Sequence, residues 1–220
     1  MAPTRLNTPT GVIGGWRADP HDAPRGGIVV VQEIFGVNRH IRSVVDRFAA
    51  HGFCAIAPAF FDHIEPGIEL DYDAAGIRHG MALASRIDFD RAIQDVAAAA
   101  ERLRDQVEHV GVVGYCWGGT VAFLANTRLS LPAVSYYGGR TVPFLRERPK
   151  AHLMMHFGSR DPHISAADVQ AHRDALPRAL IRVWDASHGF NCDQREDYDE
   201  AAAQGAFRLT RRFFRWVLGS

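Results

Sequence analysis

The chain has 220 residues, of which 47% are hydrophobic and 23% are charged, and its 25 Lys and Arg balance its 25 Asp and Glu. This length and composition predict one globular domain over residues 1–220, with a core that needs no disulfide or metal cross-links. A net charge of zero excludes proteins that gather nucleic acid or anionic membranes through a strongly basic surface. Three scattered cysteines, Cys54, Cys116 and Cys192, argue against a disulfide framework and against a structural zinc site.

The apolar segments of the chain are short. Residues 1–9 lack a basic stretch followed by an apolar run, and no run reaches the ~18 apolar residues of a membrane span. We therefore expect a soluble, cytoplasmic protein that binds neither nucleic acid nor membrane and exists as a monomer or small homo-oligomer.

Apolar runs rich in β-branched residues alternate with helical patterns along the chain. The first half predicts a strand at Gly27–Val31, a helix at Arg39–Ala50, a strand at Phe53–Ala57, a helix at Phe89–Arg104 and a strand at Val110–Val113. The second half predicts a helix at Trp117–Asn126, strands at Ala133–Tyr137 and Ala151–Phe157, a helix at Ala166–Ala175, a strand at Leu180–Trp184 and a helix at Tyr198–Val217. This alternation is typical of an α/β fold with a mostly parallel central sheet and helices on both faces.

One segment, Phe60–Ser85, interrupts the alternation, and we call it the excursion segment. It contains four turn-forming residues among acidic and aromatic ones, namely Pro66, Gly67, Gly76 and Gly80. An irregular segment of this length in a compact domain is typical of a binding loop or lid. A surface flap without chemistry is the alternative.

A cysteine stands where a predicted strand turns into a helix, in Gly114-Tyr115-Cys116-Trp117-Gly118. Small neighbours let strand and helix approach closely there, so that the side chain between them is exposed at the carboxyl edge of the sheet. The N–H of Trp117 opens the helix and can donate to an oxyanion. The pattern predicts that Cys116 is a nucleophile, the alternative being a buried thiol without chemistry.

An acid and a histidine follow Cys116 in the order expected of a nucleophile on such a turn. Asp161 comes directly after the predicted strand Ala151–Phe157, and His188 comes after Leu180–Trp184. The carboxyl ends of parallel strands share one sheet edge, so the three side chains are expected to meet there. His188 would take the thiol proton, and Asp161 would orient the imidazole.

Other titratable residues carry less weight. Asp185 is an alternative orienting acid with a poorer reach toward His188. His152 and His156 are four apart on a predicted strand, which separates them by about 13 Å, so we expect no shared metal. The remaining histidines of interest are predicted at the surface or at helix ends, and these are His40, His51, His79, His109 and His172.

A glutamate follows the first predicted parallel strand, in Gln32-Glu33-Ile34-Phe35-Gly36. A carboxylate among apolar neighbours is costly to bury unless it is paired, which suggests a task, although an exposed loop glutamate is the alternative. In a fold with a nucleophile turn, the loop after the third strand supplies the second oxyanion donor. The N–H of Ile34 would then partner that of Trp117, and Glu33 would lie beside Cys116.

Several of these motifs together resemble the dienelactone hydrolase (carboxymethylenebutenolidase) family. The matching segments are Gln32-Glu33-Ile34-Phe35-Gly36, Gly114-Tyr115-Cys116-Trp117-Gly118-Gly119, Tyr136-Tyr137-Gly138, Gly158-Ser159-Arg160-Asp161-Pro162 and His188-Gly189-Phe190. The resemblance implies an α/β-hydrolase fold and hydrolysis of a lactone or ester by a Cys-His-Asp triad through a thioester, with no metal or organic cofactor. It also implies that Glu33 contacts the resting Cys116 thiol and that substrate binding shifts this carboxylate.

This chain departs from the family where the substrate carboxylate binds. The family uses one arginine from the excursion segment and one four residues beyond the catalytic histidine, where this chain has Cys192. Arg78, Arg86 and Arg195 are candidates for the role, but none matches by position. The acyl group of the substrate therefore stays open.

The sequence thus predicts a cysteine-dependent hydrolase of small esters or lactones. One alternative keeps the fold without turnover, as a binding protein or a thiol redox sensor. Another is a peptidase or acyl transferase on the same scaffold.

Overall fold

The structure is a computed structural model that describes residues 1–219. It contains one eight-stranded sheet in the order β1-β2-β4-β3-β5-β6-β7-β8. The strands are β1 (Ala2–Thr8), β2 (Gly11–Ala18), β3 (Gly27–Val31), β4 (Cys54–Pro58), β5 (Val110–Tyr115), β6 (Ala133–Tyr136), β7 (Leu153–Gly158) and β8 (Leu180–Trp184). The α-helices are α1 (Arg39–Ala50), α2 (Ala74–Ser85), α3 (Phe89–Arg104), α4 (Trp117–Leu129), α5 (Ala166–Ala175) and α6 (Glu200–Leu218), with short 3-10 helices at Phe60–His63 and Val142–Phe144.

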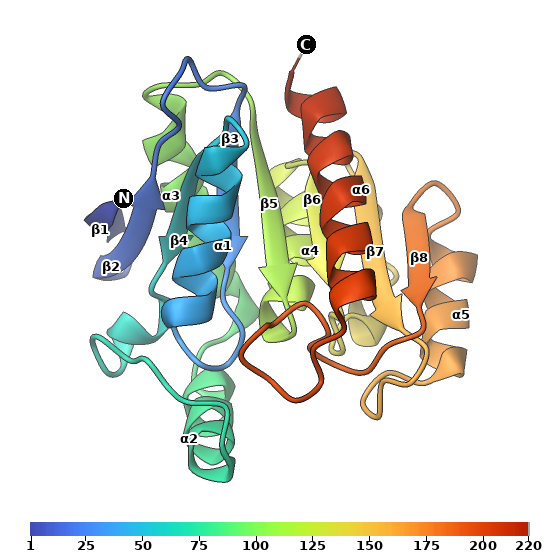
Figure 1. Cartoon of the computed structure of the whole chain (residues 1–220). Coiled ribbons are helices and arrows are strands. Elements are labelled where there is room, and N and C mark those ends of the chain that lie inside the picture. Colours follow the sequence, from blue (N-terminus) through green and yellow to red (C-terminus); the bar gives the residue numbers. More distant parts are fainter. Residues whose placement is uncertain (220) are drawn as a thin grey trace.

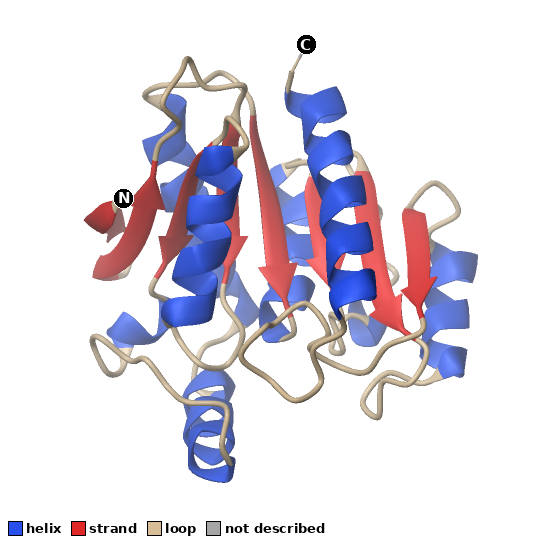
Figure 2. Cartoon of the chain, in the orientation of Figure 1, coloured by secondary structure: helices blue, strands red, loops and turns tan. Residues whose placement is uncertain are grey.

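Helices cover both faces of this sheet. Helices α1 and α6 lie on one face, and α3, α4 and α5 lie on the other (Figures 1 and 2). Every pairing from β4 through β8 is parallel, so these strands end at one edge, the lower edge in Figure 1. The predicted α/β architecture is confirmed. Within residues 1–219, no helix combines the length and the apolar character that a membrane span requires.

The central strands are buried along their whole length. All residues of β3, β4, β5, β6 and β7 are buried, because helices cover both sides of them. Parallel strands in this setting have continuous apolar sequences rather than alternating ones, and runs such as Gly27–Val31 are of that kind. The predicted strand and helix positions agree with the structure to within a few residues at each end.

The hairpin β1–β2 was not predicted from the sequence. It adds two antiparallel strands to one side of the sheet, with β2 against β4. Most β1 side chains are exposed and only Leu6 is buried there, while Ile13 is buried on β2. Because most of the hairpin faces solvent, it lacks the apolar run by which the other strands were found.

The excursion segment (Phe60–Ser85) lies at the carboxyl edge of the sheet and is partly helical (Figure 1). The prediction of a loop was wrong for its second half, which forms α2. The side chain of Asp73 caps this helix by accepting a hydrogen bond from the Gly76 N–H at 2.7 Å. A Cβ added to Gly80 would lie 2.0 Å from the carbonyl oxygen of Ile34. Gly80 therefore allows α2 to pack closely on the loop after β3.

Gly114→Ala is expected to destabilise the junction between β5 and α4. An added Cβ would lie 1.8 Å from the backbone oxygen of Gly118, and backbone on both sides leaves little room to relax. We expect the free energy of unfolding to fall by about 3 kcal/mol, measured by urea denaturation. Gly139→Ala is the matched control, because its nearest neighbour is a side-chain atom of Ile164 at 3.5 Å. Equal stability of the two variants would contradict the predicted close packing.

Candidate active site

Cys116 lies on the sharp turn between β5 and α4. Its backbone has φ 53° and ψ −116°, a strained conformation for a residue with a side chain. The turn is held on both sides, because the Cys116 N–H donates to Tyr136 O at 3.0 Å and the Cys116 carbonyl accepts from Gly119 N–H at 2.9 Å. The cysteine is partly exposed. The backbone therefore presents this thiol at the N-terminus of α4, as the sequence predicted.

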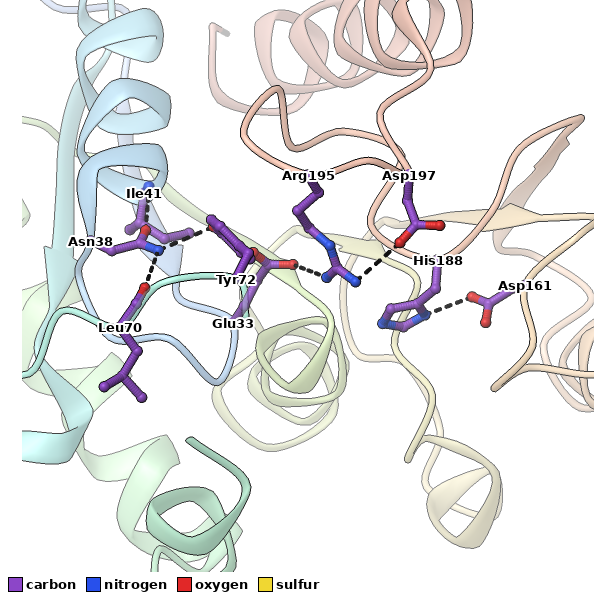
Figure 3. A network of polar contacts seen from close by, with 9 residues as sticks. All are labelled: Glu33, Asn38, Ile41, Leu70, Tyr72, Asp161, His188, Arg195 and Asp197. Atoms are coloured by element: carbon purple, nitrogen blue, oxygen red, sulfur yellow. Dashed lines mark hydrogen bonds and ion pairs between the residues drawn. The ribbon is translucent and has the colours of Figure 1, made fainter. Parts of the chain in front are cut away.

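His188 and Asp161 are in direct contact. The Nδ1 of His188 donates to Asp161 Oδ2 at 2.7 Å, and the other carboxylate oxygen accepts from the His163 N–H at 2.8 Å. Both residues are buried, on the loops after β8 and β7, respectively (Figure 3). The carboxylate is thus fixed by the backbone of its own loop and in turn fixes the imidazole.

The surroundings of His188 favour its protonated form. Burial alone would lower the pKa of the imidazole, but side-chain hydrogen bonds to Asp161 and Cys116 raise it to about 10. The imidazole ring also packs 5.0 Å from the Tyr137 ring, measured between centroids. At neutral pH His188 is therefore an imidazolium between a carboxylate and a sulfur atom, which is the charge arrangement that stabilises a thiolate.

Asp185 does not contact His188. Its side chain is 81% exposed and accepts a hydrogen bond from Arg160 Nη1 at 2.8 Å. Of the two acids weighed from the sequence, it is Asp161 that the structure places against the imidazole.

Glu33 is buried in the loop after β3, with 1% of its surface exposed. Its Oε2 accepts a hydrogen bond from the Tyr72 hydroxyl at 3.1 Å, and its Oε1 lies 3.6 Å from Arg195 Nη1 (Figure 3). Burial and the charge of Glu33 raise the pKa of Tyr72 well above its ordinary value. The hydroxyl therefore stays protonated and donates a hydrogen bond to Glu33. The alternative of an exposed loop glutamate is wrong.

Only one of the three candidate arginines reaches this cluster. The Arg195 guanidinium lies beside Glu33, 3.3 Å from Asp197 Oδ2 and 5.7 Å from the centroid of the Tyr72 ring. Arg78 and Arg86 are exposed on α2 and at its C-terminal cap. Arg195 lies three residues beyond Cys192, the position where the family has its arginine. The geometry of this loop, rather than its position in the sequence, brings the guanidinium to Glu33.

Two backbone N–H groups are available at the junction of these loops. Over residues 1–219, neither the Ile34 N–H nor the Trp117 N–H donates a hydrogen bond to the backbone. A Cβ on Gly118 would lie 2.4 Å from Gln32 O, so the start of α4 packs directly on the loop that carries Glu33. This arrangement is consistent with the predicted pair of oxyanion donors.

His40 and Cys192 were not singled out as site residues from the sequence. His40 lies at a helix end, one of the two positions predicted for it, but it is fully buried at the first turn of α1 rather than exposed. Its Nδ1 lies 3.6 Å from Asp193 Oδ1. Burial opposes the charged ring, but Asp193 and Cys192 raise the pKa of His40 to about 9. The signal for burial was its helical spacing with Val44, since residues four apart share one helix face.

His172 is also buried, and its Nδ1 bonds the backbone oxygen of Asp168 at 2.7 Å. His156 packs in the core, where its Nε2 bonds Thr210 at 3.1 Å, while the His152 ring lies 4.4 Å from the Trp216 ring at a tilt of 51°. His152 and His156 therefore have separate partners.

The fold and the site together define the class of this protein. The sheet is mostly parallel, and the nucleophile turn is followed in the chain by an acid and then a histidine, each after a later strand. This arrangement is typical of an α/β hydrolase. The model of the dienelactone hydrolase family matches residues 13–218, and the chain belongs to this family.

Proteins similar in sequence and in structure agree with this assignment. Carboxymethylenebutenolidase of Pseudomonas putida is 31% identical over 202 residues, which cover 87% of this chain and 86% of the relative. A Synechocystis protein provisionally named carboxymethylenebutenolidase is 34% identical over 227 residues, covering 94% and 92% of the two chains. The crystal structure of a provisionally assigned dienelactone hydrolase from Klebsiella pneumoniae superposes with a TM-score of 0.85 at 26% identity, covering 97% and 98%. The protein is therefore a hydrolase of the dienelactone hydrolase type.

Proposed function

We propose that this protein hydrolyses a lactone or carboxylic ester with Cys116 as nucleophile, His188 as acid and base, and Asp161 as the residue that orients His188. The observation that carries the proposal is the 2.7 Å hydrogen bond between His188 and Asp161 at the sheet edge where the strained turn presents Cys116. Family membership and the shared fold support the same reaction class.

The proposed reaction passes through a thioester. The Cys116 thiolate attacks the carbonyl carbon, and the N–H groups of Ile34 and Trp117 stabilise the oxyanion that forms. Collapse of this intermediate breaks the ester C–O bond, and the leaving oxygen takes the His188 proton. The neutral imidazole then accepts a proton from water, whose oxygen attacks the thioester. Release of the acid restores the thiolate beside the imidazolium.

Glu33 has a supporting part in this proposal. Over residues 1–219, no hydrogen bond joins Glu33 to Cys116; the carboxylate instead accepts one from Tyr72 and lies beside Arg195. We propose that these two partners hold the carboxylate back, so that the thiol interacts with His188 alone. This arrangement differs from the expectation that Glu33 contacts the resting Cys116 thiol, because Tyr72 and Arg195 occupy the carboxylate.

Steady-state hydrolysis of p-nitrophenyl acetate and of a dienelactone tests the proposal. Turnover of either ester that disappears in Cys116→Ala is the expected result. Absence of turnover with both would favour the redox sensor or binding protein. Faster aminolysis than hydrolysis in the presence of an added amine would favour the acyl transferase.

Arg195 is proposed to bind an anionic group of the substrate. Its guanidinium is 17% exposed beside Glu33, and a bidentate guanidinium pairs well with a carboxylate. We expect Arg195→Gln to raise the KM for the dienelactone, which carries a carboxylate, about tenfold more than the KM for the neutral acetate ester. Michaelis kinetics on both substrates measure this ratio.

Two further variants make this measurement decisive. Arg173→Gln changes an exposed arginine on α5 and serves as the control. If Arg78→Gln shifts the ratio and Arg195→Gln does not, the excursion segment holds the substrate carboxylate, and the role of Arg195 is wrong.

A further inference from the structure

Three buried side chains meet behind the proposed catalytic residues. Glu33 from the loop after β3, His40 from the start of α1 and Cys192 from the loop after β8 each offer one ligand atom, and these atoms all lie within 4.8 Å of one another. The three residues are at most 1% exposed. The proposed reaction gives no task to His40 or Cys192, so their placement beside Glu33 calls for its own explanation.

Two of these side chains have unmet hydrogen-bonding capacity. Among residues 1–219, Nδ1 and Nε2 of His40 and Oε1 of Glu33 have no hydrogen-bond partner. A buried polar group without a partner destabilises a fold, and such groups are rare in native proteins. An ion bound between them would satisfy a nitrogen and an oxygen at once.

Asp193 adds a carboxylate on the far side of the imidazole. Its Oδ1 lies 3.6 Å from His40 Nδ1, and its side chain is 53% exposed. Histidines that bind metals through one ring nitrogen usually direct the other nitrogen at a carboxylate, which fixes the tautomer and the orientation of the ring. With Nδ1 facing Asp193, Nε2 of His40 is the nitrogen available to an ion.

We infer that Glu33, His40 and Cys192 bind a divalent transition-metal ion of the zinc type. Thiolate, imidazole and carboxylate are the ligands that Zn²⁺ prefers, whereas Mg²⁺ and Ca²⁺ take oxygen ligands. Bonds of about 2.0–2.3 Å in a tetrahedral site place donor atoms about 3.5 Å apart, so the side chains close by roughly 1 Å on binding. The ion displaces the protons of the imidazole and the thiol to solvent.

The neighbouring charges determine how this site is coupled to catalysis. Arg195 lies 3.6 Å from Glu33 and Tyr72 donates to it, so an incoming cation takes over part of the charge that Arg195 now balances. Resting on the proposed function, a metal ion bound to Glu33 leaves Arg195 free to pair with an anionic substrate, and therefore lowers the KM for the dienelactone. The reaction itself needs no metal.

Cobalt titration of the full chain tests the site. Co²⁺ substitutes for Zn²⁺ at tetrahedral sites and gives a near-ultraviolet charge-transfer band when a thiolate is a ligand. We expect a saturable band at one equivalent that Zn²⁺ abolishes. Cys192→Ser should remove the band and weaken Zn²⁺ binding about 100-fold, and Asp193→Asn should weaken it about tenfold. His40→Gln should also remove the band.

The other two cysteines provide matched controls. Cys54→Ser and Cys116→Ser should both keep the band, and Zn²⁺ should raise the melting temperature of Cys116→Ser but not of Cys192→Ser. A band that is lost in Cys116→Ser and kept in Cys192→Ser would place the metal on the catalytic thiol and overturn the inference. So would the absence of a band in the parent protein at millimolar Co²⁺.

These experiments measure metal binding and ester hydrolysis independently of each other. Cys116→Ser lacks the proposed nucleophile, so metal binding by this variant does not depend on the proposed function. In the parent protein, Zn²⁺ at the concentration that saturates the site should lower the KM for the dienelactone more than the KM for p-nitrophenyl acetate. A shift of the same size in Cys192→Ser would contradict coupling through this site.

Discussion

Cys116→Ser is expected to lower kcat/KM for p-nitrophenyl acetate by about 1,000-fold or more. The reason lies in the pairing of His188 with the sulfur, since Cys116 and Asp161 both raise the pKa of this imidazole against the opposing effect of burial. A serine hydroxyl has a far higher pKa than a thiol, so it forms no ion pair with the imidazole at neutral pH. The oxygen nucleophile therefore stays protonated in an otherwise intact site.

Steady-state kinetics with the parent protein, Cys116→Ser and Cys54→Ser measure this effect. Cys54 is buried on β4, where its thiol donates to Gln106 Oε1 at 3.4 Å, so it serves as the control thiol and should keep the parent rate. Equal rates for the parent and Cys116→Ser would contradict the nucleophilic role of the sulfur.

Asp161→Asn is expected to reduce kcat/KM by about 1,000-fold, since a misoriented imidazole loses most of its acid and base function. The substitution also removes a hydrogen bond that raises the pKa of His188. In the parent protein, the charged ring stabilises the fold fully below pH 6.5, and this stabilisation is lost as the pH rises through about 10. In Asp161→Asn, the loss should occur at lower pH.

Two pH profiles check this prediction. The alkaline limb of kcat/KM should move to lower pH in Asp161→Asn, and urea denaturation should show a fall in stability that begins near pH 6.5 in both proteins but ends at lower pH in Asp161→Asn. Asp185→Asn is the matched control, because Asp185 is exposed and bonded to Arg160. An unchanged alkaline limb in Asp161→Asn would show that Asp161 does not set the protonation of His188.

Local sequence patterns located most of the fold and the residues proposed to carry the reaction. The continuous apolar strands could be found because helices bury them on both faces, and a buried parallel strand has one recognisable composition. Cys116 and Asp161 could be found because each follows such a strand, and His188 because it follows the shorter apolar run Leu180–Trp184, which is not buried. Their meeting at one edge follows from the parallel direction of those strands.

The surroundings of the site depended on contacts that no local pattern encodes. Tyr72 reaches Glu33 from the excursion segment, 39 residues away in the chain, and Arg195 reaches it from the loop after β8. Such loops follow the shape of the surface they cover rather than a repeating pattern. Their side-chain partners are therefore fixed only when the whole chain has folded.

The sequence by itself determined the strands β3–β8 and the helices α1 and α3–α6, the turn that carries Cys116 and the positions of Asp161 and His188. The tertiary structure decided that the polar hairpin β1–β2 extends the sheet, that Glu33 is buried beside Arg195, and that His40 and Cys192 lie next to it. The physical reason is the separation along the chain over which each effect acts. Hydrophobic periodicity and turn chemistry act over a few residues. The pairing of buried charges depends on side chains that only the packed fold brings together.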